Sequence, residues 1–258
     1  VVLIGMFALM LTPPSSFAKT LRMLTSYPPH IELVAGSIKI IKDTLVRLSD
    51  GKMNIKILGP DVVPTLEQFQ PLQAGVFDMF FGYGGYHTSA TAIGVLPDAM
   101  IPDPAKMRQK GIFKYIDEHY NRLGVKVIAM FPTTEIHIQT RFPLEGRNPS
   151  LSGLKIRTGA SLAAMMKTFG GSPVITNPGE VYMSLQKGVL DGGTALVFGG
   201  RSYKWHEVTK YMTRPTFGGI TMLVLMNMNK YNQLSAEERQ SVDETVKVAE
   251  LECAKFFS

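Results

Sequence analysis

The stretch from Ser152 to Gly193 reads SGLKIRTGASLAAMMKTFGGSPVITNPGEVYMSLQKGVLDGG. Residues 154–158 and 174–175 have the pattern of short strands. Each run is followed by a segment with helical periodicity, at about 161–169 and at 179–187. Strands that alternate with helices in this way predict an α/β fold with mainly parallel sheets.

The same alternation continues on both sides of this stretch. The apolar pattern predicts further strands at 21–25, 53–57, 76–81, 125–130, 136–140 and 220–228, and helices at 31–48, 65–74 and 105–120. In open α/β sheets, ligands bind beyond the carboxyl ends of the strands. Residues that follow the predicted strands are therefore the first candidates for a binding site.

Two capping boxes are predicted at helix starts. Thr65 and Gln68 have the spacing of a box that opens the helix ending near Ala74, and Ser235 and Glu238 have the same spacing before the last helix. In such a box each side chain accepts a hydrogen bond from the backbone N–H of the other residue.

Composition places the chain among ordinary globular proteins. It has 258 residues, of which 45% are hydrophobic and 19% charged, and a formal net charge of +6. The basic residues are scattered, and the small clusters at 106–110 and 201–214 lack any nucleic-acid-binding motif, so we expect a solvated surface and no nucleic-acid partner. A single cysteine, Cys253, excludes an internal disulfide.

The N-terminal segment has the pattern of a secretory leader. Residues 1–11 are apolar, a polar turn with small residues near a possible cut after Ala18 follows, and the first charge is Lys19. We interpret residues 1–18 as part of a signal peptide, which implies export. A buried core element is the alternative. The apolar run is far shorter than the roughly 20 residues of a membrane-spanning helix.

Motifs for catalysis are absent from the sequence. It contains no G-x-S-x-G elbow, no Walker A loop and no complete G-x-G-x-x-G. The five histidines are far apart, without the spacing of metal ligands. The sequence therefore predicts neither an enzyme nor a cofactor or metal site.

Six short motifs together resemble the TRAP-type (tripartite, ATP-independent periplasmic) solute-binding proteins, the DctP family. The motifs are Gly153-Leu154-Lys155-Ile156-Arg157, Gly170-Gly171-Ser172-Pro173-Val174, Glu180-Val181-Tyr182, Leu185-Gln186-x-Gly188-Val189-x-Asp191-Gly192, Asp50-Gly51-Lys52 and Gln73-Ala74-Gly75-Val76-Phe77-Asp78-Met79. The resemblance extends over nearly the whole chain from about Leu21. The set is specific, whereas any one motif alone is weak.

The resemblance implies a two-lobed, periplasmic-binding-protein-like fold with a cleft on the hinge side. Residues 19–132 and 214–258 would form the first lobe and residues 133–213 the second. The implied function is that of a periplasmic receptor, which binds a small organic carboxylate and delivers it to the membrane subunits of an ion-gradient-driven TRAP transporter.

Arg157 is the principal candidate for the binding site. The resemblance places at this position the arginine that clamps the carboxylate of the solute. A guanidinium fits a carboxylate through two parallel hydrogen bonds, and Gly159 leads into a predicted helix N-terminus that adds donors. From the residues alone, a structural salt bridge with Asp191 is the competing interpretation.

Three more candidates follow predicted strands or begin helices. Arg141 ends a strand and is either a second carboxylate contact or a surface arginine. Glu67 lies at a helix start, where a negative side chain is favourable anyway, although its family analogue can face the pocket. Tyr83, with Tyr86 beside it, either walls the site or packs in the core.

The remaining candidates are Asn177, Phe198 and Phe217. Asn177 precedes a proline and is either a turn residue or a ligand contact, and the two phenylalanines either shape an apolar wall or belong to the core. The run from Asp191 to Ala195 lacks the acidic residue or asparagine that some family members carry there. We therefore expect one polar contact of those members to be missing.

Two other classes of function stay open at this point. One is the ligand-binding module of an ATP-driven importer or of a regulator. The other is an enzyme on a similar two-lobed scaffold, for which the sequence shows no catalytic constellation.

Overall fold

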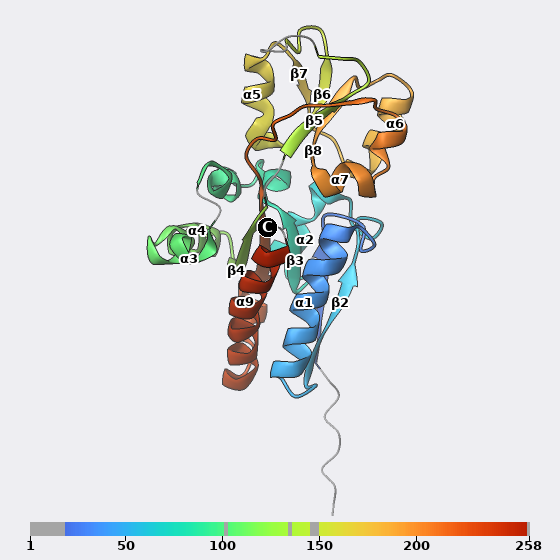
Figure 1. Ribbon diagram of the computed structural model, residues 1–258. Coiled ribbons are helices and arrows are strands. Elements are labelled where there is room, and N and C mark those ends of the chain that lie inside the picture. Colours follow the sequence, from blue (N-terminus) through green and yellow to red (C-terminus); the bar gives the residue numbers. More distant parts are fainter. Residues whose placement is uncertain (1–18, 101–102, 134–135, 145–149, 257–258) are drawn as a thin grey trace, which may run out of the picture.

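The computed structural model describes residues 19–100, 103–133, 136–144 and 150–256. The predicted leader, residues 1–18, lies outside them. Two five-stranded sheets form the framework of the described residues, sheet A in the order β2-β1-β3-β10-β4 and sheet B in the order β7-β6-β8-β5-β9. Figure 1 shows them in two lobes, one above the other. The predicted α/β, two-lobed fold is confirmed.

The strands and helices follow one another along the whole chain. The strands are β1 (Lys19–Thr25), β2 (Met53–Leu58), β3 (Met79–Tyr83), β4 (Val125–Pro132), β5 (Ile136–Thr140), β6 (Lys155–Arg157), β7 (Ser172–Val174), β8 (Gly192–Leu196), β9 (Tyr211–Met212) and β10 (Thr221–Asn227). The α-helices are α1 (Glu32–Leu48), α2 (Phe69–Gln73), α3 (Pro104–Gln109), α4 (Ile112–Asn121), α5 (Ala163–Thr168), α6 (Val181–Gln186), α7 (Val197–Ser202), α8 (Met228–Asn232) and α9 (Ala236–Phe256). Short 3-10 helices are η1 (Thr65–Glu67), η2 (Gly84–His87), η3 (Ala92–Ala99), η4 (Ala160–Leu162), η5 (Pro178–Glu180) and η6 (Trp205–Glu207).

Each described sheet has four strands that run one way and one strand that opposes them. In sheet A the opposing strand is β10, which is antiparallel to β3 and β4. In sheet B it is β5, which is antiparallel to β8 and β9. Both opposing strands come directly after the chain has crossed from the other sheet, so each one enters its sheet from the side where the two lobes meet.

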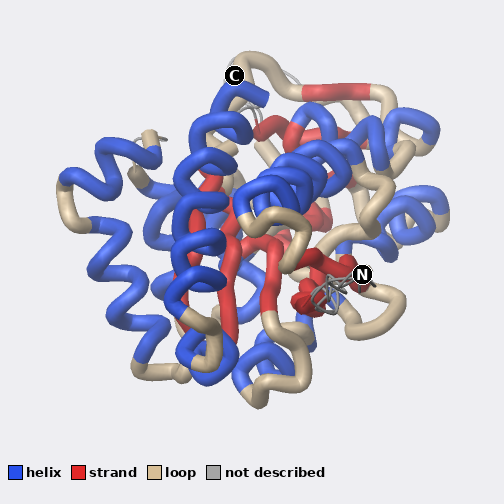
Figure 2. The backbone as a smooth tube through the Cα atoms, turned by 90° about the horizontal axis from the view of Figure 1, so that it is seen from below, coloured by secondary structure: helices blue, strands red, loops and turns tan. Residues whose placement is uncertain are grey.

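The central strands β3 and β10 of sheet A are apolar on both faces because helices cover both. Along β3, Met79 and Phe81 belong to the core beneath α1 and α9, whereas Phe80 belongs to the core beneath α2 and α4. Strands buried on both sides have continuous apolar sequences, as β3 and β10 do. Figure 2 shows α1 and α9 side by side on one face of the sheet.

Two chain crossings connect the sheets and are hydrogen-bonded to each other. The Thr133 backbone N–H donates to the Ile220 carbonyl at 2.7 Å, and the Phe217 N–H donates to the Ile136 carbonyl at 2.7 Å. The predicted lobe boundaries, 132/133 and 213/214, stay a prediction.

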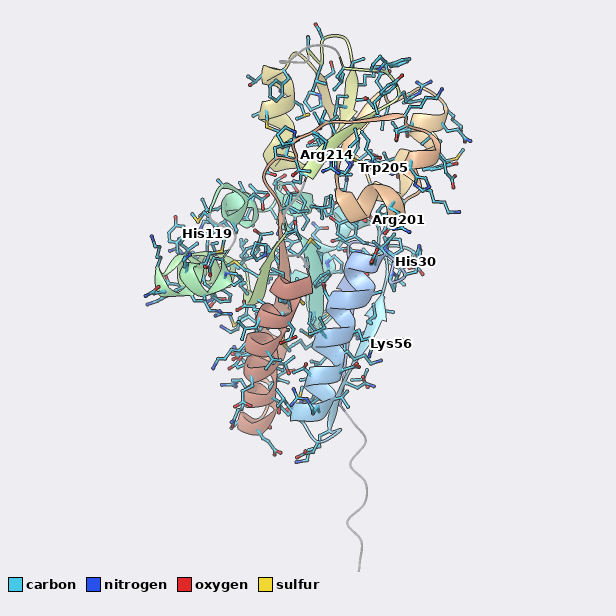
Figure 3. All side chains as sticks on the ribbon, viewed as in Figure 1. His30, Lys56, His119, Arg201, Trp205 and Arg214 are labelled. Atoms are coloured by element: carbon cyan, nitrogen blue, oxygen red, sulfur yellow. The ribbon has the colours of Figure 1, made fainter. Side chains whose placement is uncertain are left out.

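Two arginines of the second predicted basic cluster lie at the surface. Arg201 and Arg214, labelled in Figure 3, are both exposed. Within the described ranges, no helix combines the length and the apolar character needed to cross a bilayer.

Candidate functional site

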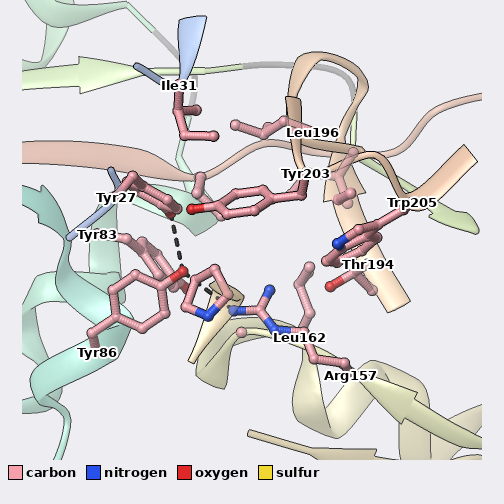
Figure 4. A pocket seen from close by; sticks show the side chains of 16 residues that line it. Tyr27, Ile31, Tyr83, Tyr86, Arg157, Leu162, Thr194, Leu196, Tyr203 and Trp205 are labelled. Carbon is pink, nitrogen blue, oxygen red and sulfur yellow. Dashed lines mark hydrogen bonds between the residues drawn. The ribbon is translucent and has the colours of Figure 1, made fainter. Parts of the chain in front are cut away.

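A cavity of about 70 Å³ lies between the two sheets. It is bordered by the carboxyl ends of β1 and β3 in sheet A and of β6 and β8 in sheet B, as expected for α/β sheets. The lining side chains are mostly aromatic and aliphatic (Figure 4). The lining residues are Tyr27, Ile31, Tyr83, Tyr86, Ile136, Arg157, Gly159, Leu162, Pro178, Thr194, Ala195, Leu196, Gly199, Tyr203, Trp205 and Ile220.

Arg157, the last residue of β6, lines this cavity and is only 7% exposed. Its terminal nitrogen donates to the Tyr86 hydroxyl and to the Thr176 carbonyl, both at 3.3 Å. Its Nε is buried and has no hydrogen-bond partner in the described part of the chain. The guanidinium therefore keeps unused donor capacity at the cavity.

No carboxylate of the described residues forms an ion pair with Arg157. Asp191, the partner in the competing interpretation, accepts a hydrogen bond from the Lys155 backbone N–H at 2.8 Å instead. Asp191 thus holds β6 against the start of β8, and the salt-bridge interpretation of Arg157 is wrong. A buried cation without a matching anion is costly, which makes this arginine unusual for a structural residue.

Three tyrosines from the first lobe, Tyr27, Tyr83 and Tyr86, line the cavity together with Arg157. Tyr86 donates from its hydroxyl to the Tyr27 hydroxyl at 3.1 Å, and its ring packs edge-on against Tyr27 and Tyr83. Burial, and then the proximity of Tyr86, raises the pKa of Tyr27 well above its ordinary value. Tyr27 therefore stays a neutral phenol at physiological pH and leaves the charge of Arg157 unmatched.

The second lobe contributes two further polar groups without partners. The Tyr203 hydroxyl and the Trp205 indole nitrogen are buried, and neither has a hydrogen-bond partner in the described ranges. Figure 4 shows both side chains and Arg157 around the same space. Buried polar groups in folded proteins are nearly always paired, so three unpaired groups at one cavity indicate that a ligand completes them.

Tyr83 links the lobes beside the cavity. Its hydroxyl donates to the Asp98 carboxylate at 2.9 Å and shares a hydrogen bond with the Ser161 hydroxyl of the second lobe. Asp98 also accepts from the Thr221 backbone N–H at 2.7 Å. Burial raises the pKa of the Asp98 carboxyl to about 6. The Asp98 carboxyl is therefore a titratable group within the contact between the two lobes.

Arg141 lies at the wrong end of its strand for the predicted role. Because β5 opposes β8, Ile136 lies at the cavity opposite Leu196, whereas Thr140 pairs with Gly192 at the far end. At about 3.4 Å per residue, Arg141 comes more than 15 Å beyond the cavity end of the strand. Its guanidinium lies over the Phe142 ring. The rule for parallel strands does not apply to this antiparallel one.

Glu67 is exposed and is not among the lining residues. The predicted helix is broken into η1 and α2, and the neighbouring Gln68 is the buried residue. Gln68 donates to the Thr25 and Val63 carbonyls at 2.9 Å. The turn is therefore held by the Gln68 amide, and Glu67 lies at the surface outside the lining of the cavity.

Two of the three remaining candidates, Phe217 and Asn177, are not among the described residues that line the cavity. Phe217 packs against the cores of both lobes, next to Ile136, and is not a lining residue. Asn177 donates to the Glu180 carboxylate at 3.0 Å and borders a neighbouring hollow that shares Tyr203 with the cavity. Phe198 is the second residue of α7, and its side chain lies outside the described part of the structure.

Several lining residues were not predicted from the sequence. Tyr27 follows β1 by two residues, so its position just beyond a strand end is the signal that could have identified it. Trp205 is the chain's single tryptophan, a residue type that combines a large apolar ring with a hydrogen-bond donor. The residues around it form no motif that would mark it as part of a binding site. Within the described residues, no group of His, Cys, Asp or Glu is arranged to hold a metal ion.

Comparison with known proteins agrees with this geometry. The family model described as "Bacterial extracellular solute-binding protein, family 7" (DctP) matches residues 34–255. Two curated relatives are the ectoine/5-hydroxyectoine-binding periplasmic protein UehA of Ruegeria pomeroyi, 34% identical over 48% of this chain and 37% of its own length, and the ectoine-binding periplasmic protein TeaA of Halomonas elongata, 30% identical over 54% and 41%. The matched stretch thus spans about two fifths of these relatives.

Solved structures share the fold over most of the chain. An extracytoplasmic solute receptor of Bordetella pertussis that binds pyroglutamic acid has a TM-score of 0.82, with 18% identity over 93% of this chain and 81% of its own. A TRAP periplasmic solute-binding protein of Chromohalobacter salexigens with bound D-glucuronate has a TM-score of 0.80, with 17% identity over 92% and 81%. With its fold, its interlobe cavity and the match to residues 34–255, the chain belongs to family 7 of the bacterial extracellular solute-binding proteins, the DctP family.

Proposed function

We propose that this protein is a periplasmic receptor that binds a small organic carboxylate between its lobes and delivers it to an ion-gradient-driven TRAP membrane transporter. The single observation that carries the proposal is the guanidinium of Arg157. It is buried at the interlobe cavity and has no carboxylate partner among the described residues. A ligand carboxylate supplies the missing negative charge.

Several features of the cavity favour an anion. Helix α1, with 17 residues, begins beside Ile31, which lines the cavity, so its positive N-terminal end lies near the site. Arg157 donates to the Tyr86 hydroxyl, which donates in turn to the Tyr27 hydroxyl, so hydroxyl groups continue from the guanidinium along the cavity wall. A charge-assisted hydrogen bond to a carboxylate in this setting is worth about 1.5–3 kcal/mol.

Ligand binding would favour the closed arrangement of the lobes. Lining residues come from both lobes, among them Tyr27 and Tyr86 from the first and Arg157 and Trp205 from the second. A ligand held by both sets binds the closed state more tightly than an open one, and it shifts the population accordingly. We propose that the transporter recognises this closed state.

The class of membrane transporter that we propose as the partner is supported by the structural neighbours. Two structural neighbours are named as TRAP transporter or TRAP periplasmic solute-binding proteins, and this supports a TRAP transporter rather than an ATP-driven importer as the partner. The lining residues include no His, Cys, Ser, Lys, Asp or Glu. We therefore propose a binding site and not a catalytic one.

Thermal unfolding with a panel of small carboxylates tests the proposal. At 100 times the Kd, a ligand stabilises the folded state by about 2.7 kcal/mol, which corresponds to roughly 5–10 °C in Tm for a chain of this size. Arg157→Ala is expected to weaken binding by roughly 10- to 100-fold, since it removes the charge-assisted contact.

Arg141→Ala is the matched control, because Arg141 is an arginine of the same lobe that does not line the cavity. It should leave the ligand-induced shift unchanged. A wild-type protein that responds to no carboxylate, or an Arg157→Ala variant that binds carboxylates as tightly as the wild type, would contradict the proposed function.

A further inference from the structure

The charges around the cavity restrict its occupant beyond the proposed carboxylate. Arg157 is the one charged residue among the described residues that line the cavity. A second carboxylate would therefore meet no cation there, and an ammonium group would meet no anion. Burial of a charge without a partner is strongly unfavourable. The cavity fits a ligand with one negative and no positive charge.

Trp205 adds a second requirement, which concerns hydrogen bonding. Its indole nitrogen is buried at the cavity and lacks an acceptor in the described residues. An indole N–H can only donate, so an oxygen or nitrogen acceptor must come from elsewhere. Arg157 cannot be this acceptor, because a guanidinium only donates. The Tyr203 hydroxyl could accept, but it forms no hydrogen bond with the Trp205 nitrogen.

The Trp205 ring is held in place and cannot turn toward another acceptor. It is 2% exposed and packs with Val181, Leu185 and Leu190. A Cβ added at Gly193 would lie 2.9 Å from the ring, so the bare glycine of β8 gives the ring its room. The Trp205 carbonyl also accepts from the Thr209 hydroxyl at 2.8 Å.

We propose that the ligand is a monocarboxylate whose uncharged body carries a neutral acceptor, such as a keto, amide or hydroxyl oxygen, and that Trp205 Nε1 donates to this acceptor. Arg157 holds the carboxylate, as in the proposed function on which this inference rests. Trp205 is then a specificity-determining residue, and the first-lobe tyrosines and the aliphatic residues cover the remaining apolar surface of the ligand.

A zwitterion is the competing occupant. Aromatic rings attract cations, and Tyr27, Tyr86, Tyr203 and Trp205 together resemble such an environment. However, the guanidinium of Arg157 lies in the same small cavity, and its charge opposes a second cation. Ectoine, a zwitterion bound by the two curated relatives according to their names, is therefore a suitable probe for this alternative.

Calorimetric titration with matched pairs tests the inference. Pyroglutamate and 3-hydroxybenzoate carry a carboxylate and a neutral oxygen, whereas cyclopentanecarboxylate and benzoate have similar shapes without that oxygen. In at least one pair, we expect the acceptor-bearing member to bind about tenfold more tightly, because its absence leaves a buried donor unpaired. Succinate and ectoine should bind more weakly than this member.

Trp205→Phe removes the N–H and retains a ring. In this variant the members of the pair should bind within about twofold of each other, while the weaker member keeps its wild-type affinity. Tyr182→Phe is the control, since it removes an exposed hydroxyl that donates to Glu207 at 2.9 Å outside the cavity. The wild-type preference within each pair decides the matter even if Trp205→Phe does not fold.

Two sets of results separate this inference from the proposed function. In the first set, carboxylates bind and their binding depends on Arg157, but succinate or ectoine binds more tightly, or the pair preference survives in Trp205→Phe. This result would overturn the inference and leave the proposed function standing. Absence of binding by every carboxylate would overturn both.

Discussion

Arg108 and Arg157 occupy opposite situations in the two lobes. Arg108 is at the surface, yet its guanidinium forms two hydrogen bonds with the buried Glu250 carboxylate, at 2.7 and 2.8 Å. Arg157 is more deeply buried and has no carboxylate among the described residues. Folding alone would favour the reverse arrangement, since a buried charge needs its partner more. The difference distinguishes an arginine that joins α3 to α9 from one kept free for a ligand.

Removal of the carboxylate from the Arg108 pair should have the largest effect. Glu250 also accepts from the Met130 backbone N–H at 3.0 Å, so Glu250→Gln leaves either the cation or this donor poorly paired. We expect a loss of about 2–3 kcal/mol in the free energy of unfolding, or roughly 5–10 °C in Tm. Calorimetry with and without ligand measures it, and ligand affinity should not change.

Glu237→Gln provides the matched control on the same helix. Glu237 pairs with Lys52, but its side chain is 72% exposed. Exposed pairs contribute little, so the change should stay below about 1 kcal/mol. Equal effects of the two substitutions would show that burial does not separate these ion pairs.

A carboxylate introduced at the cavity should give Arg157 an internal ion-pair partner, as Glu250 is for Arg108. Leu162 lines the same cavity as Arg157, and Leu162→Glu places an acid there. The internal acid would compete with the ligand, and affinity for carboxylates should fall about 30-fold, equivalent to about 2 kcal/mol. The unliganded variant should be at least as stable as the wild type.

Leu162→Gln separates charge from shape in this experiment, because it has nearly the same length and no charge. Titration calorimetry should show a much smaller loss for glutamine than for glutamate. If both variants lose the same affinity, the effect is steric, and Arg157 does not act through its unmatched charge.

The two predicted capping boxes illustrate what the sequence reveals about the fold. Ser235 and Glu238 form the predicted reciprocal bonds, at 2.8 and 3.1 Å. Thr65 and Gln68 have the same spacing, but Thr65 donates to the Ser26 carbonyl and Gln68 to the Thr25 carbonyl. The second pair lies where β1 ends and the chain turns toward the cavity, and there tertiary contacts take precedence over a local motif.

The candidate site was predictable where a motif coincided with a parallel strand. Arg157 and Tyr83 end such strands and line the cavity. Arg141 ends an antiparallel strand, and the sequence pattern of β5 does not reveal its direction. Trp205 reaches the cavity only because β8 presents the bare Gly193 to its ring, and this is a long-range contact that sequence periodicity does not encode.

Asp98 is the inverse of Arg157, because it is a half-buried carboxyl without a cation partner in the described residues. Burial raises its pKa to about 6, above the ordinary value of 3.8. A raised pKa favours the folded state below about pH 4, and this contribution is lost as pH rises through 6. His87 acts in the opposite direction, since burial lowers its pKa to about 4 and its contribution is lost as pH falls below 6.5. Wild-type profiles therefore combine both groups.

Asp98→Asn isolates the carboxyl from this background. Its amide retains an acceptor for the Thr221 N–H and a donor for the Tyr83 hydroxyl, so the lobe contact is preserved. The difference in unfolding free energy between variant and wild type should shift in favour of the variant by about 2 kcal/mol from pH 4 to pH 7, because the wild type alone must bury a charge as Asp98 ionises. Urea unfolding across this range measures the difference. A constant difference would mean that Asp98 is solvated like a surface acid, and that among these groups only Arg157 holds an unmatched charge.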